Sequence, residues 1–104
     1  MGIDCRVEDE DGGVLNGLPD SQSLVAFLLT PNDSTFGETV CLRFIDEYGD
    51  TTFNQLQIPV LLLELRGAVL RCTNLEARAH GEKLVSLVAT TDGKMHTYVK
   101  FIGD

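Results

Sequence analysis

The chain has 104 residues, of which 43% are hydrophobic and 7% aromatic, and its formal net charge is −8. This length predicts a single domain, residues 1–104, with a core of its own, and the composition excludes a disordered chain. No apolar run approaches the roughly 18 residues that a membrane span needs, and no basic leader opens the sequence, so we expect a cytoplasmic protein without a membrane partner.

The negative charge is concentrated in the first half of the chain. Residues 1–50 hold eleven acids and two bases, a net charge of −9, whereas residues 51–104 hold five acids and six bases. Phosphate contacts require a basic surface, so this distribution argues against a nucleic-acid partner. It favours a basic protein, which an acidic region attracts electrostatically. The plainer alternative is that the acids serve solubility alone.

Residues 3–8 predict the first strand. Ile3, Cys5 and Val7 alternate with polar residues, which is typical of a strand with one buried face. The following "DEDGG", residues 9–13, has turn composition, and residues 14–15 return as a short hairpin partner.

A short helix is predicted over residues 20–29, with Asp20 or Ser21 as its cap and Pro31 ending it. Residues 31–38 form a polar loop. Residues 39–46, "TVCLRFID", then predict a second strand whose two apolar faces suit a central position in a sheet.

Residues 59–72 predict a helix that is apolar at nearly every position, with Pro59 in its first turn. A helix with so little polar surface is covered either by its own domain or by a second chain, so a homodimer through Pro59–Cys72 is one expectation. A further helix opens with the capping-box spacing of Thr73 and Glu76, and residues 95–102 predict the last strand. This order predicts an α+β fold: a small, mostly antiparallel sheet of three to four strands with about three helices packed on it.

The three cysteines, Cys5, Cys41 and Cys72, are far apart and form no Cys-x-x-Cys pair. We expect reduced thiols. A metal site that joined them to His80 or His96 would need long-range convergence that the spacing does not indicate, so no metal and no cofactor are predicted.

Two short segments invite a catalytic or ligand-binding interpretation. Asp46, Glu47 and Asp50 lie within five residues, and hard cations bind clustered carboxylates, but the spacing of a calcium-binding EF-hand loop is absent. The favoured reading is a turn. His96, Tyr98 and Lys100 share one face of the last predicted strand and have side chains suited to acid–base chemistry, yet no nucleophile signature accompanies them. The favoured reading is a sheet face, and no catalytic residue is assigned.

The segments "LRFIDEYGDTTFNQLQIPVLLLEL" and "HTYVKFIGD", with an opening like "MGIDCRVEDEDGGVL", together resemble a group of small, uncharacterised bacterial proteins. The resemblance covers most of the chain. It implies a bacterial source and neither an activity nor a site. Size and acidity are also similar to those of toxin-immunity proteins, a likeness of class without a motif.

We therefore predict a non-enzymatic acidic protein-binding domain, immunity-like in character, that neutralises a basic partner. The residues predicted to form or flank its binding surface are Glu8, Asp9, Glu10, Asp11, Asp46, Glu47 and Asp50. Two alternatives stay open: an accessory or self-associating domain, and a small enzyme that uses His96 and Tyr98 with the acids of residues 46–50.

Overall fold

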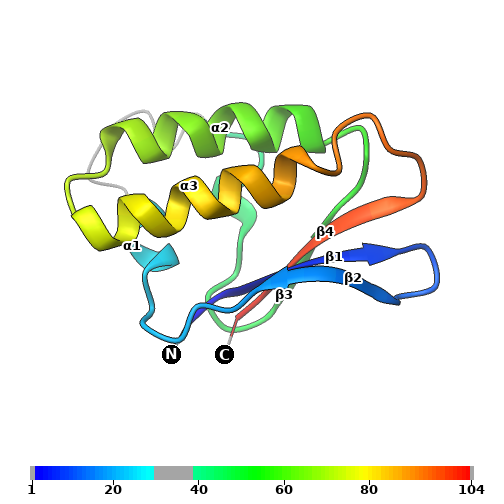
Figure 1. Ribbon diagram of the computed structural model, residues 1–104, viewed down its shortest axis with the longest axis horizontal. Helices are drawn as coiled ribbons and strands as arrows, with labels where there is room; N and C mark the ends of the chain where they lie inside the picture. The colour runs from blue at the N-terminus through cyan, green and yellow to red at the C-terminus, as the bar shows by residue number, and fades with distance from the viewer. Residues whose placement is uncertain (1, 30–38, 104) are drawn as a thin grey trace.

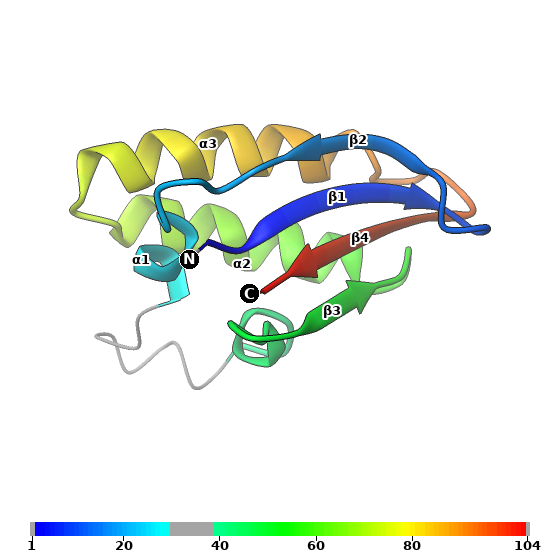
Figure 2. The same ribbon diagram turned by 90° about the horizontal axis from the view of Figure 1, so that it is seen from below.

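A computed structural model describes residues 2–29 and 39–103. It is a two-layer α+β fold in which helices cover one face of a four-stranded antiparallel sheet (Figure 1), as predicted. The strand order is β2-β1-β4-β3, and Figure 2 shows the uncovered face in front of the helices. The strands are β1 (Asp4–Asp9), β2 (Val14–Leu18), β3 (Asp50–Phe53) and β4 (Thr97–Ile102); the helices are α1 (Val25–Leu29), the short 3₁₀ helix η2 (Leu42–Phe44), α2 (Ile58–Arg71) and α3 (Leu75–Ala89).

The core lies between the sheet and the two long helices. The alternation predicted for the first and last strands is confirmed, because Cys5, Val7, Val99 and Phe101 are all buried on the helix-facing side. Phe101 meets Phe53 of β3 edge to face, with ring centroids 6.0 Å apart. The alternate residues of β1 and β4 therefore lie on the open face of the sheet.

The β1–β2 hairpin is longer than predicted, because β2 continues to Leu18. Its turn uses Gly12, which has a φ of +84°, a left-handed conformation that favours glycine. At the other end of the sequence, β4 begins at Thr97 rather than at residue 95. His96 has a φ of +61°, which takes it out of the extended conformation.

The strand predicted over residues 39–46 is wrong. The backbone N–H groups of Val40, Cys41 and Leu42 donate to the Glu64 carboxylate of α2 at 2.7–3.0 Å, and the chain then enters η2. Their hydrogen bonds are thus satisfied by a side chain instead of a neighbouring strand. The strand that pairs with β4 on the side away from β1 is Asp50–Phe53, a segment for which the sequence predicts no strand.

The predicted helices are confirmed, but they begin or end at other residues than predicted. Asp20 caps α1, accepting from the N–H groups of Leu24 and Val25, but the helix starts only at Val25 because Ser23 has a φ of +57°. Asn74, not Thr73, caps α3 by accepting from the N–H of Ala77 at 3.0 Å, so the predicted capping box is wrong. The predicted polar loop 31–38 lies outside the described residues. None of the described helices is long and apolar enough to cross a membrane.

Candidate protein-binding surface

The sheet register places the seven predicted acids in two separate groups. Asp9 pairs with Thr97 at one end of β4, whereas Asp50 pairs with Ile102 at the other end. Five residues of strand separate these positions, about 16 Å at the usual rise of 3.3 Å per residue. The acids of 8–11 and those of 46–50 therefore do not form one continuous patch.

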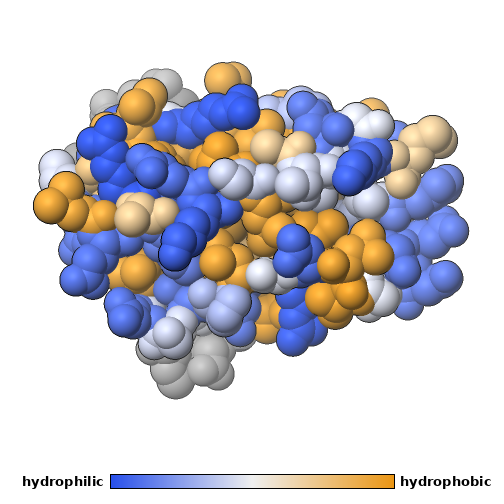
Figure 3. Space-filling view, in the orientation of Figure 1, coloured by the Kyte–Doolittle hydropathy of each residue, from blue (hydrophilic) through white to orange (hydrophobic). Residues whose placement is uncertain are grey.

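The first group lies at the hairpin end of the sheet, and we call it the hairpin surface. It comprises Glu8, Asp9, Glu10 and Asp11 together with the exposed apolar side chains Val14 and Leu15. The Asp9 carboxylate accepts from the N–H groups of Asp11 (3.0 Å) and Gly13 (2.7 Å), so Asp9 shapes the turn. Glu10 contacts His96 at 3.0 Å, and both side chains are more than half exposed. Figure 3 shows a hydrophilic end of the molecule here, beside an area of hydrophobic side chains.

The second group lies at the opposite end, where the turn 46–49 packs against the C-terminal end of β4. Gly103 donates to the carbonyl of Gly49 at 2.8 Å. Asp46 accepts from the N–H of Tyr48 and so makes the turn, while Asp50 pairs with Lys100 at 3.4 Å. Two aromatic residues that the sequence did not single out, Phe44 and Tyr48, are exposed nearby. The only sequence feature that could have indicated their exposure is the position of an aromatic residue beside turn residues.

Basic side chains separate the two groups on the open face. Arg6 of β1 lies directly opposite Lys100 of β4 in the register. Lys100 also pairs with Asp50, and Glu8 is opposite Tyr98. The centre of this face is therefore mixed in charge, and the acids without a basic neighbour lie toward its two ends.

The helical layer carries no net negative charge. α2 and α3 together contain three acids (Glu64, Glu76, Glu82) and four bases (Arg66, Arg71, Arg78, Lys83). The rest of the described chain contains ten acids and four bases. The negative potential thus belongs to the sheet and its loops.

His96 and Tyr98 are not brought to the acids of 46–50. His96 contacts Glu10, and Tyr98 is opposite Glu8 at the hairpin end of the sheet. Tyr98 and Lys100 do share the open face, as predicted, but His96 lies outside the strand. The juxtaposition on which the enzyme alternative depends is therefore not present among these residues.

The cysteines are free, and two of them are buried. Burial raises the pKa of the Cys5 thiol to about 12. The pKa of Cys41 is also raised, by burial first and by the negative charge of Glu64 second. Both thiols stay protonated at neutral pH, which makes them poor nucleophiles.

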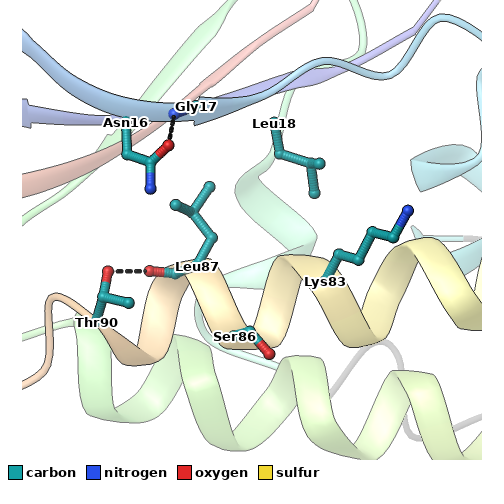
Figure 4. A pocket seen from close by; sticks show the side chains of 7 residues that line it. All are labelled: Asn16, Gly17, Leu18, Lys83, Ser86, Leu87 and Thr90. Carbon is teal, nitrogen blue, oxygen red and sulfur yellow. Dashed lines mark hydrogen bonds between the residues drawn. The ribbon is translucent and has the colours of Figure 1, made fainter.

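A groove of about 290 Å³ separates the edge strand β2 from α3 (Figure 4). Its polar groups are largely engaged locally: Asn16 accepts from the N–H of Gly17, and Thr90 donates to the carbonyl of Leu87. Lys83 is the only charged residue that lines it, and none of the seven predicted acids does. The groove therefore offers no pair of acid and base for catalysis.

Asp20 is a buried carboxylate with a structural role that sequence reasoning found only in part. Besides capping α1, it accepts from the N–H of Ile3 at 3.1 Å. Nε2 of His80 is 4.0 Å from Oδ1 of Asp20 and has no hydrogen-bond partner within the described part of the chain. Through its hydrogen bonds with Ile3, Leu24 and Val25, Asp20 joins the N-terminal segment to the start of α1.

No family model, curated protein or solved structure matches this chain. Within residues 2–29 and 39–103, no group of three or more His, Cys, Asp or Glu side chains could hold a metal ion.

Proposed function

We propose that this protein is a non-enzymatic binding domain that holds a basic protein partner, in the manner of an immunity protein, through the hairpin surface. The observation that carries the proposal is the position of Glu8, Asp9, Glu10 and Asp11 at one end of the sheet, with exposed Val14 and Leu15 beside them. Apolar contact area with a charged surround is the usual anatomy of a protein interface. The acids would accelerate association and select for a basic surface.

The turn 46–49 is the weaker of the two acidic ends for this purpose. This end has three acids, Asp46, Glu47 and Asp50, and the Lys100 cation pairs with Asp50. Among the described residues, the four hairpin acids form an ion pair only with His96, which contacts Glu10. A basic partner therefore gains more electrostatic energy at the hairpin end.

The experiment is affinity capture on the immobilised protein at graded salt, followed by titration of the purified captured protein. The test variant is Glu10→Gln/Asp11→Asn, which removes two exposed charges and leaves the turn-forming Asp9 intact. The matched control is Glu47→Gln/Asp50→Asn, which removes two charges at the opposite end of the sheet.

We expect a basic partner whose association rate falls severalfold in the hairpin variant and with rising salt, because steering between exposed charges is screened. The control variant retains wild-type association to within about twofold, since its charges are more than a Debye length from the hairpin. Capture of acidic or neutral proteins only, or binding indifferent to both salt and the hairpin variant, contradicts the proposal.

A further inference from the structure

Helix α2 has apolar side chains on two opposite sides. One side enters the core, with Ile58, Leu61, Leu62, Leu65, Ala68 and Val69 buried. At 100° per residue, the opposite side presents Val60, Leu63, Gly67 and Leu70, and Leu56 extends it in the turn before the helix. The three leucines are 80% (Leu56), 71% (Leu63) and 72% (Leu70) exposed. We call these five residues the outer stripe.

The spacing of the outer stripe is that of a helix–helix seam. Its members follow one another at intervals of four, three, four and three residues, and none is charged. This is the repeat with which one helix packs along another. Figure 3 shows hydrophobic side chains reaching the surface over the helical layer.

The charges around the outer stripe favour a second copy of this chain on this face. α2 contains Glu64, Arg66 and Arg71, a net charge of +1, and the Glu64 carboxylate is turned toward residues 40–42. The protein as a whole carries −8. Two copies that met through their sheets would place like charges together, whereas the helical layers meet with little repulsion.

We propose that the outer stripe is the interface of a homodimer in which α2 packs antiparallel to α2 of a second copy, across a two-fold axis near Leu63. Leu56 and Leu70 are each seven residues from Leu63. The two-fold axis therefore places Leu56 of one copy against Leu70 of the other. Val60 then faces Gly67, the one position without a side chain. The Arg71 guanidinium borders that gap, 3.1 Å from where a Cβ of Gly67 would lie.

The size of this surface predicts a weak dimer. The outer stripe has five residues, whereas a stable interface involves about 20–30 residues on each partner. The stripe is widened on one side by a groove between α2 and α3, lined by Arg66, Val69, Leu70, Glu82 and Val85, and exposed Val40 lies beside Glu64. Dimerisation should therefore depend on protein concentration. It does not depend on the proposed partner, because the hairpin surface is on the sheet.

Sedimentation equilibrium of the full chain over a wide concentration range tests the dimer. We expect a monomer–dimer equilibrium that Leu63→Glu weakens by at least about tenfold, because a charge replaces a leucine at the centre of the seam. Leu15→Glu, a control at an exposed leucine of β2, leaves the equilibrium unchanged. A wild-type protein that stays monomeric at every concentration, or a dimer indifferent to Leu63→Glu, overturns the proposal.

Cysteine cross-linking in a Cys72→Ser background tests the antiparallel arrangement. The Leu63→Cys variant should form a disulfide under mild oxidation between position 63 of one copy and position 63 of the second copy. Leu56→Cys should not, since the two copies of that position would be about 21 Å apart along the helices, at 1.5 Å per residue. Efficient cross-linking of Leu56→Cys indicates a parallel pair and contradicts the two-fold axis near Leu63.

Discussion

Gly81 of α3 and Val69 of α2 touch where the two helices pack, and a Cβ added to Gly81 would lie 2.7 Å from Cγ2 of Val69. Leu28 of α1 is nearly as close, at 3.2 Å. The helices approach each other at a point where no side chain larger than glycine fits. A glycine that weakens an isolated helix therefore permits the packing of this one.

Gly81→Ala should destabilise the protein by about 1–3 kcal/mol, because the added methyl group overpacks a filled contact. Urea unfolding monitored by circular dichroism measures the change. The control is Gly67→Ala, compared at concentrations where the protein is monomeric; a Cβ there would lie nearest the flexible Arg71 side chain. That variant should be stabilised by up to about 1 kcal/mol through better helix propensity. Equal effects of the two substitutions would contradict the close approach at Gly81.

Glu64→Gln should destabilise the protein by about 1–3 kcal/mol. A neutral amide has one oxygen in place of the two that accept from Val40, Cys41 and Leu42, and its NH₂ group faces donors. Hydrogen exchange of these three amides should quicken. Glu82→Gln, an exposed acid on α3, should change stability by no more than about 0.5 kcal/mol. Unaltered exchange at residues 40–42 in Glu64→Gln would argue against the contact.

The stability of the protein should fall as the pH rises from about 9 to about 12. The folded Cys5 thiol keeps its proton up to a pKa of about 12, whereas an unfolded thiol loses it near 8.5. The native state then binds the proton that the unfolded state has lost, which lowers the free energy of unfolding by up to about 1.4 kcal/mol per pH unit. Denaturant titrations of the wild type and of Cys5→Ala isolate this contribution, because other alkaline titrations are common to both. Identical slopes above pH 9 would be the contrary result.

His96→Gly should change stability by less than about 1 kcal/mol. Glycine relieves a left-handed conformation that costs other residues about 1–2 kcal/mol, and this gain offsets its larger unfolded-state entropy and the loss of an exposed pair with Glu10. His96→Val should be less stable than His96→Gly by about 1–2 kcal/mol, since β-branched residues avoid this conformation. Thermal unfolding compares them, and a more stable valine variant would be inconsistent with the φ of residue 96.

The sequence by itself determined the elements whose signals are local. The alternation of Ile3, Cys5 and Val7 marked β1 and its buried face, the Asp- and Gly-rich segment marked the hairpin turn, and the long apolar run from Pro59 marked α2. These signals depend on residues within a few positions of one another, and they sufficed for the fold class.

Only the tertiary structure decided which segment completes the sheet and where the surfaces lie. Residues 39–46 do not form the edge strand, which is Asp50–Phe53, because Glu64 of α2 accepts from the N–H groups of residues 40–42. The register of β4 placed the two acidic segments at opposite ends, and an all-round apolar α2 gave no indication of which face would be left outside. Strand pairing and helix packing between distant segments fix these outcomes, and no local pattern in the sequence indicates them.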